Sequence, residues 1–464
     1  MRLTGKLVLA PLAALWCVSA LQAQDSNELL NRMKAMEERI RALESEVQTL
    51  KGQPAVAAAP AQAIPAPPPV EQAQAPVDLG GAGGAAAKVL NPDISVIGDF
   101  IAAAGNHGGR ATPALEMHES EVGFQEVIDP YARADFFISF GEKGVNLEEG
   151  YLTFTSLPAG FQVKAGKMRA AFGKVNTQHN HTLSWIDRPL VTQNLVAGED
   201  GINDAGVSVS RILPSPKGLF LEGTAQIFRG DSENTFASTR RSDVSAVGHL
   251  RAYSDLSEST NIDFGLSYAR GHSPFADGNN QLYGIDATLR WKPLRRAIYN
   301  SFVARSEFIW ARTSVTPAYS YGAILIGIVG APLPNPILPP PEFRRTLVKP
   351  FGFYVSGDYQ LGRRWILGGR FDQSERGRCL PTNPETVSSA CTFLNPATGE
   401  SFQFSNTSSL VRDTGGSVLL TYKPSEFSLL RGQFRRTSYG EGRIANEFLL
   451  QLQFAMGAHG AHPF

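Results

Sequence analysis

Strict alternation of apolar residues in the segment 446–454 constrains the fold of this chain more than any other feature. Every second residue is apolar, namely Phe448, Leu450, Leu452 and Phe454. The residues between them are Leu449, Gln451 and Gln453. Side chains two positions apart share one face of a strand, so the segment predicts a strand with one apolar and one partly polar face. Two architectures use such strands: a soluble β-sandwich, and a barrel with lipid outside and water inside.

The rest of the chain favours the barrel. Alternating segments recur at 92–104, 115–127, 131–141, 146–155, 161–171, 205–213, 218–229, 244–256, 260–271, 280–292, 300–312, 350–361, 364–374, 411–423, 427–437 and 444–456. Together they predict about sixteen strands, an even number typical of bacterial barrels. Connections after even-numbered strands are short, whereas most of those after odd-numbered strands are long: 172–204, 230–243, 313–349 and 375–410. Outer-membrane barrels show this alternation because their periplasmic turns are short and their extracellular loops are long.

Membrane physics leads to the same fold class. No window outside the N-terminus reaches ~18 consecutive apolar residues, so no membrane-spanning helix is predicted. In lipid every backbone polar group needs a partner, which leaves the closed barrel as the alternative to helices. We therefore predict an all-β chain: a transmembrane antiparallel β-barrel of about sixteen strands, preceded by a short α-helical coiled coil and a Pro/Ala-rich linker.

The predicted interior is charged and wide. About sixteen strands leave an aqueous lumen. The inward positions carry both signs: Arg133, Asp135, Glu149, Glu222, Arg251, Asp263, Asp286, Arg290, Arg305, Glu307, Asp358, Arg370, Asp372, Arg431 and Arg435. Over the whole chain Lys+Arg and Asp+Glu balance at 43 each, which argues against a nucleic-acid partner.

The first 23 residues have the pattern of a secretory signal peptide. Arg2 and Lys6 precede an apolar run that ends near Ala23, and we expect cleavage before Gln24. Cys17 lies inside this run after Leu15 and Trp16, without the small residue that a lipidation motif places before its cysteine. The signal implies export, so the barrel is expected in the bacterial outer membrane.

Residues 25–51 predict a periplasmic coiled coil. The heptad seam consists of Leu29, Met33, Met36, Ile40, Leu43, Val47 and Leu50. Flanking charges, such as Arg32 opposite Glu37, are complementary in a parallel register, and the repeated Arg-h-x-x-h-Glu pattern resembles that of short parallel trimers. The alternative interpretation is an amphipathic helix that packs on its own barrel.

Residues 53–88 predict a disordered Ala/Pro/Gly linker, and residues 90–464 form the predicted barrel domain. The linker composition cannot bury a core and favours partly polyproline II structure. Both a tether that reaches the cell wall, with peptidoglycan as a partner, and a plain flexible spacer fit this composition. Cys379 and Cys391 lie together in the 375–410 loop, and an even pair in an exported chain predicts a disulfide.

Three stretches carry a resemblance to a known family. Residues 129–135, 149–152 and 163–173 resemble the phosphate-selective porin O and P family, whose relatives include channels labelled zinc-regulated outer-membrane receptors. The strand 446–454 close to the aromatic terminus Phe464 also resembles the insertion signal of bacterial outer-membrane barrels. The family resemblance implies a homotrimeric channel in outer-membrane lipid whose third extracellular loop, here 172–204, folds inward. It implies no phosphate site, because the family's arginine ladder and lysine ring cannot be placed on this sequence.

We predict a pore constriction from the inward loop and the charged wall. Its residues are Lys164, Lys167, Arg169, His179, His181, Asp187, Arg188, Arg133, Arg251, Arg290, Arg305 and Arg370. Rings of charge set the selectivity of a channel. The cluster Lys164, Lys167 and Arg169 before the loop favours anions.

The expected function is passive diffusion of small hydrophilic solutes or ions, with no cofactor. The pair His179 and His181 is a candidate metal site, with Asp187 as a third ligand, so a zinc-linked metal uptake channel is one alternative. A structural barrel that ties the outer membrane to the cell wall is another. Ser184 with these histidines and Asp187 could be read as a hydrolase set, but no nucleophile motif surrounds it, and we predict no enzyme.

Overall fold

The computed structural model describes residues 92–106, 113–141, 144–232, 235–315, 346–377, 392–394, 401–403, 410–440 and 442–457. All of them belong to one compact unit, Gly81–Phe464. The predicted signal peptide, coiled coil and linker, and also Cys379 and Cys391, lie outside the described residues.

Sixteen strands make the barrel. They are β1 (Asp93–Gly105), β2 (Leu115–Asp129), β3 (Ala132–Gly141), β4 (Gly144–Phe154), β5 (Phe161–Arg169), β6 (Asn203–Ile212), β7 (Leu219–Phe228), β8 (Ser245–Ser257), β9 (Thr260–His272), β10 (Asn279–Trp291), β11 (Phe302–Val315), β13 (Phe351–Leu361), β14 (Trp365–Gly377), β17 (Leu410–Ser425), β18 (Ser428–Ser438) and β19 (Ile444–Gly457). Each predicted strand corresponds to one of these, with ends shifted by a few residues.

Short elements that the alternation did not predict accompany the barrel. The strand β12 (Thr346–Val348) extends the pairing of β11, and β15 (Thr392–Leu394) pairs with β16 (Ser401–Gln403). Two 3₁₀ helices, η1 (Pro158–Gly160) and η2 (Asn180–Thr182), and one α-helix, α3 (Leu190–Leu195), complete the described elements. Strands of three residues are too short for a period of two to be recognised in the sequence.

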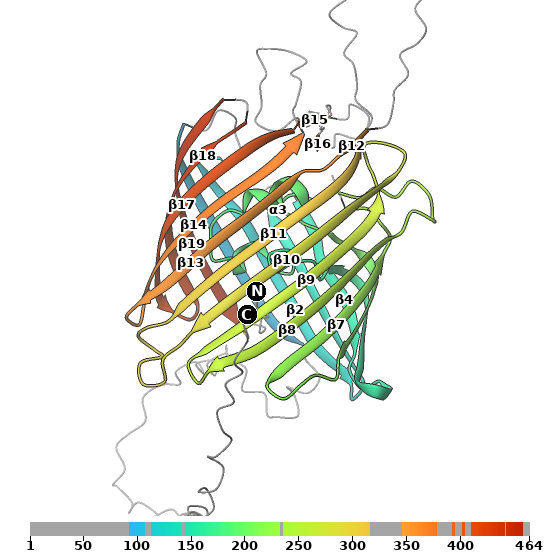
Figure 1. Ribbon diagram of the computed structural model, residues 1–464. Coiled ribbons are helices and arrows are strands. Elements are labelled where there is room, and N and C mark those ends of the chain that lie inside the picture. The colour runs from blue at the N-terminus through green and yellow to red at the C-terminus, as the bar shows by residue number, and fades with distance from the viewer. Residues whose placement is uncertain are drawn as a thin grey trace, which may run out of the picture. The chain divides into compact units, whose positions relative to one another are not determined.

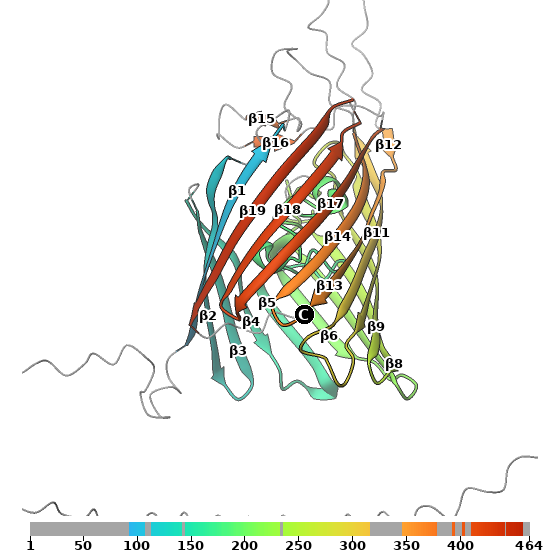
Figure 2. The ribbon, with the colours of Figure 1, turned by 90° about the vertical axis from the view of Figure 1, so that its left-hand side faces the viewer.

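The sheet closes on itself between its first and last strands. Each barrel strand pairs antiparallel with the next, and β1 pairs with both β2 and β19 (Figure 2). In the β1–β19 register Gly98 lies opposite Phe454, and a Cβ atom on Gly98 would come within 2.4 Å of the Phe454 ring. The glycine therefore leaves the space that the ring occupies across the closing seam. The predicted closed antiparallel barrel is confirmed.

The two faces of the barrel have the polarity of a membrane-spanning wall. On β19 the apolar residues Phe448 and Leu452 point outward and are 52% and 46% exposed, whereas Glu447 and Gln451, which precede them directly in the chain, are buried inside. On β14 Phe371 faces outward while Arg370 faces inward. An apolar outer band around a polar interior defines a transmembrane β-barrel, which confirms the predicted fold class.

Among the residues that the structure describes, no helix combines the length and the apolar character needed to cross a membrane.

The longest described connection enters the barrel. It runs from residue 170 to residue 202 between β5 and β6, carries η2 and α3, and lies inside the ring of strands (Figure 1). The sequence placed its bounds two residues later at each end. We call residues 170–202 the inward loop.

Candidate functional site

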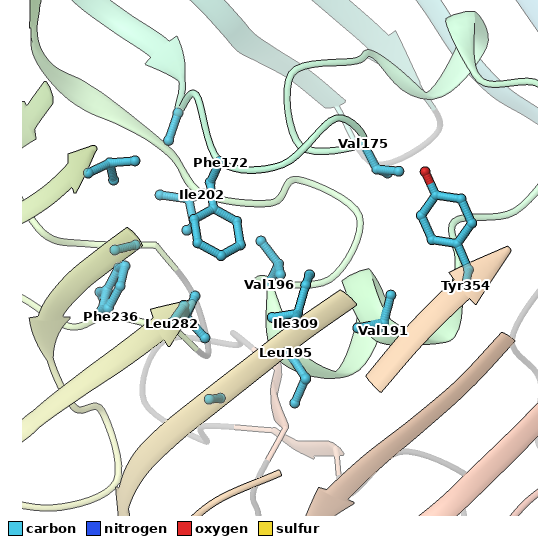
Figure 3. Close-up of a cluster of buried hydrophobic side chains, with 14 of the residues drawn as sticks. Phe172, Val175, Val191, Leu195, Val196, Ile202, Phe236, Leu282, Ile309 and Tyr354 are labelled. Carbon is cyan, nitrogen blue, oxygen red and sulfur yellow. The ribbon is translucent and has the colours of Figure 1, made fainter. Parts of the chain in front are cut away.

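Apolar packing holds one side of the inward loop against the barrel wall. Phe172, Val191 and Leu195 of the loop belong to one buried cluster with Leu282 of β10 and Ile309 of β11 (Figure 3). Outward-facing apolar residues suit lipid, whereas an apolar patch on the inner wall would face water unless something covered it. The loop covers this patch, so burial of apolar surface fixes its position.

A glycine lets the loop approach the wall at its start. Gly173 has φ +61°, a left-handed conformation that residues with a Cβ rarely adopt. A Cβ at this position would also overlap the carboxylate of Glu307 on β11. The buried carboxylate of Glu307 thus lies directly against the backbone at the first turn of the loop, which holds this turn close to β11.

A charged anchor holds the middle of the loop to β14 and β18. The side chain of Asp187 accepts hydrogen bonds from Arg370 at 2.7 Å and from Arg435 at 2.7 Å, and also from the amide of Gln433. Next to it the Trp185 ring packs edge-on against Tyr354 of β13, with centroids 5.2 Å apart. Burial alone would raise the pKa of Asp187, but Arg370 and Arg435 hold that pKa well below its ordinary value.

A second polar anchor holds the loop to β2 and β4 on another part of the wall. His179 Nδ1 lies 2.8 Å from Glu121 Oε2 and 3.0 Å from Glu148 Oε2, and its Nε2 lies 2.9 Å from Glu149 Oε2. His181 Nδ1 lies 3.8 Å from Glu119 Oε2 and 3.8 Å from Glu121 Oε2. Burial alone would lower the pKa of His179, but its hydrogen bonds to the three carboxylates raise it well above its ordinary value.

Two β-bulges build this acidic wall. Between β3 and β4 the register passes from Phe137↔Glu149 to Ile138↔Leu147, so Glu148 has no opposite residue. Because of this extra residue Glu148 and Glu149 are both buried, although neighbours on a regular strand would face opposite sides. The register of β2 against β1 also skips one residue, His118, next to Glu119.

A basic wall faces the lumen from β8, β10 and β11. Arg251 of β8 pairs with Asp263 of β9 at 2.8 Å, and Lys174 of the loop reaches the same carboxylate at 3.1 Å. Arg290 of β10 lies 3.8 Å from it, and Arg305 of β11 pairs with Asp358 of β13. The three arginine side chains are 35%, 25% and 23% exposed in strand order, whereas the side chain of Asp263 is 3% exposed.

The predicted constriction residues fall into three groups. Arg133, Lys164, Arg251, Arg290 and Arg305 occupy inward positions on the strands. Asp187, Arg370, His179, His181, Arg169 and Arg188 are anchor residues of the inward loop. Arg188 lies inside the loop, where it donates to Asn180, Val175 and Gln178.

Lys167 forms the third group, and the structure corrects its placement. It lies opposite Gly150 on β4, which lies opposite the outward-facing Phe136 on β3. Residues directly opposite each other share a face, so Lys167 belongs to the outer face, and its Nζ donates to the carbonyl of Leu147. The sequence prediction assigned it to the lumen together with Lys164, but the two residues are three positions apart, and residues an odd number of positions apart on a strand face opposite sides.

Sequence reasoning missed Glu119, Glu121 and Glu148. The spacing of Glu119 and Glu121, two residues apart on a predicted strand, could have placed both on the inner face. The bulge that turns Glu148 inward has no comparable sequence pattern. Asp187, proposed as the third metal ligand, instead binds the two arginines Arg370 and Arg435.

The fold and the site together define a sixteen-stranded transmembrane β-barrel whose longest described loop is anchored inside it. No protein-family model matches the chain. An uncharacterised protein of Aquifex aeolicus (strain VF5) is 26% identical over 434 residues, which cover 81% of each chain. The resemblance to the phosphate-selective porin O and P family therefore stays a prediction.

Solved structures with a similar arrangement are outer-membrane proteins. OprB of Pseudomonas putida has a TM-score of 0.48 at 9% identity and covers 81% of this chain and 97% of its own. An anion-selective porin from Comamonas acidovorans has a TM-score of 0.46 at 11% identity and covers 79% and 99%. The outer-membrane channel DcaP of Acinetobacter baumannii has a TM-score of 0.45 at 12% identity and covers 79% and 96%.

Proposed function

We propose that the protein is an outer-membrane channel for passive diffusion of small hydrophilic solutes, narrowed by the inward loop. One observation carries the proposal: a long loop inside the barrel is held at three places on the wall, by the contact of Gly173 with Glu307, by Arg370 with Arg435, and by the β2–β4 carboxylates. Leaving one partner of a buried ion pair without the other is costly, so these ion pairs hold the loop in its place inside the barrel.

We further propose a preference for anions. The carboxylates Glu119, Glu121 and Glu148 are buried against the loop, where a passing ion cannot reach them. The side chains of Arg251, Arg290 and Arg305 stay partly accessible, while those of their partners Asp263 and Asp358 are mostly covered. Selectivity follows the charges that a permeating ion meets at close range, so the accessible lumen is effectively basic.

Zinc-linked uptake receives less support as a second function. Ligands for a transported ion must stay open and bind weakly enough to release it. His179 and His181 are instead buried, at 4% and 3% exposure, between the loop and the wall. The structural alternative, a barrel tied to the cell wall, depends on residues 25–88 and is compatible with a channel.

The assembly remains part of the proposal. The heptad seam Leu29–Leu50 supports a homotrimer with its coiled coil in the periplasm, which chemical cross-linking of detergent-purified protein would test. A monodisperse monomer would count against it. We also propose a disulfide between Cys379 and Cys391; thiol labelling of intact cells without reductant would refute it.

Planar-bilayer recording tests the channel directly. Purified full-length protein should produce discrete conductance steps, and a KCl gradient should give a reversal potential displaced toward that of chloride. Protein that inserts as a folded barrel and yet passes no current would refute the channel, whereas a reversal potential on the potassium side would refute only the anion preference.

A further inference from the structure

Five donor atoms from three separate segments lie in one buried cluster. Nδ1 of His179 and of His181 come from the inward loop, and Oε2 of Glu119, Glu121 and Glu148 come from β2 and β4. Donor atoms of Glu121, His179 and His181 all lie within 4.8 Å of one another, and so do those of Glu119, Glu121 and Glu148. Glu121 belongs to both sets, so they form two overlapping triads that share this carboxylate.

The spacing of these atoms suits a common metal ion. Metal–ligand bonds of about 2.0–2.1 Å separate neighbouring donors of a tetrahedral site by roughly 3.3 Å. The distances from His179 Nδ1 to Glu121 and Glu148 are 2.8 Å and 3.0 Å, and those from His181 Nδ1 to Glu119 and Glu121 are both 3.8 Å. They bracket the expected separation, so small shifts would place the donors around one ion.

A further carboxylate sets the orientation of one imidazole. His179 Nε2 lies 2.9 Å from Glu149 Oε2, and the other oxygen of Glu149 accepts the backbone N–H of Arg169 at 2.6 Å. A histidine that binds a metal through one nitrogen usually donates the other N–H to a carboxylate, which fixes its tautomer. With its Nε2–H directed at Glu149, the lone pair of Nδ1 is directed toward Glu121 and Glu148.

The charges of the site also call for a cation. Four carboxylates, those of Glu119, Glu121, Glu148 and Glu149, are buried together. Among the described ion pairs, Arg169 lies 3.2 Å from Glu148 and His179 lies within 3.0 Å of Glu121, Glu148 and Glu149, so Arg169 and a protonated His179 set two positive charges against four carboxylates. Oε2 of Glu119, a residue 6% exposed, accepts no hydrogen bond from any residue that the structure describes. A buried carboxylate oxygen without a partner is costly, and a bound cation would satisfy it.

We propose that His179, His181 and Glu121, with Glu119 or Glu148 completing the set, bind one divalent first-row transition-metal ion that fastens the inward loop to β2 and β4. Mixed imidazole and carboxylate donors suit zinc, iron, cobalt or manganese, whereas calcium and magnesium prefer oxygen ligands throughout. Because all five side chains are buried, the ion is a fixed structural part and not a solute in transit. The site goes beyond the proposed channel function and does not depend on it.

Metal analysis of the full-length protein tests this site. Protein stripped with a chelator, dialysed and titrated with Zn²⁺ should bind one ion per chain, and Co²⁺ in its place should give visible absorption bands typical of nitrogen and oxygen ligands. His179→Ala and Glu121→Gln should each weaken Zn²⁺ binding at least tenfold. His249→Ala is the matched control, because His249 also faces the interior but bonds to Ser267 at 2.8 Å away from the site, and it should bind Zn²⁺ as the unaltered chain does.

Each outcome decides the question. A folded barrel that binds neither Zn²⁺ nor Co²⁺ would overturn the proposal. It would mean that the imidazoles and carboxylates of the cluster are linked by hydrogen bonds and not by a metal ion. Stoichiometric binding that survives both substitutions would overturn it as well, because the ion would then lie elsewhere. If the variants do not fold, X-ray absorption at the zinc edge of the unaltered protein decides: two imidazoles with oxygen ligands support the site, and any other ligand set contradicts it. None of these readouts requires the protein to conduct.

Discussion

Asp187 and Arg370 are separated by 183 residues in the chain, and their side chains meet at 2.7 Å inside the barrel. The same arginine donates to the backbone carbonyl of Asp187 and lies over the Trp185 ring at 5.2 Å. One side chain on β14 thus fixes the backbone, the carboxylate and the neighbouring aromatic ring of the inward loop. This contact is the strongest reason to regard the loop as a permanent part of the interior.

Removing the charge of Asp187 should loosen the loop. Asp187→Asn leaves Arg370 and Arg435 without their shared carboxylate, and breaking a buried pair from one side costs about 3–5 kcal/mol. We expect the free energy of unfolding in urea to fall by that order, and open-channel current noise to rise. Asp231→Asn is the control, because Asp231 and its partner Arg229 are 55% and 61% exposed, and it should change stability by less than about 1 kcal/mol. Equal stability of the two variants would contradict the anchor.

The basic wall should determine ion selectivity. Replacing Arg251, Arg290 or Arg305 by Gln removes one accessible positive charge each. A unit charge at ~4 Å is worth about 1 kcal/mol in water, so each change should lower the anion-to-cation permeability ratio roughly two- to fivefold. Reversal potentials in a KCl gradient measure this ratio. Arg436→Gln serves as control because Arg436 is exposed and pairs with Asn446; selectivity that responds equally to all four changes would contradict a localised wall.

Lys174 should make anion preference depend on pH. Burial lowers the pKa of Lys174, Asp263 raises it, and the guanidinium groups of Arg251 and Arg290 lower it further, with a net lowering. His249 also faces it. A lysine with a lowered pKa loses its positive charge at a lower pH than an ordinary lysine, whose pKa is about 10.4.

Anion preference should therefore decline as pH rises from 7 toward 10. Lys174→Arg should keep the preference nearly constant over that range, because a guanidinium stays charged. Lys174→Gln should show the lower preference already at pH 7. Reversal potentials measured across this pH series would exclude the assignment if all three proteins gave parallel curves.

The outward face of β17 should tolerate no charge. Val418 lies mid-strand and is 61% exposed on that face, so Val418→Arg should cost about 2–4 kcal/mol in a lipid bilayer. Folding yield into lipid vesicles, followed by heat-modifiable gel mobility, measures the loss. Ser210→Arg introduces the same residue at an inward, half-buried position of β6, and its yield should stay near that of the unaltered chain. The reverse order would mean that the two faces are assigned wrongly.

The sequence was sufficient for the barrel but not for the anchors. Alternation along each strand reports which face is polar, which is why Phe448 and Gln451 could be assigned before the structure was known. Alternation could not predict the Asp187–Arg370 contact, because this contact joins a loop without a regular period to a strand far along the chain. The inward direction of Glu148 was equally hidden, since a bulge shifts the face of one residue without changing the local composition.

Covalent modification of a single loop cysteine tests the central claim, that the inward loop narrows the channel, most directly. Ser184 lies in the loop and is half-buried. In a chain with Cys379 and Cys391 replaced by Ser, Ser184→Cys should react with a charged methanethiosulfonate reagent and lose a large part of its unit conductance. Ser242→Cys, on an exposed connection between β7 and β8, should react without loss of current. Unchanged conductance after full modification at position 184 would contradict the account.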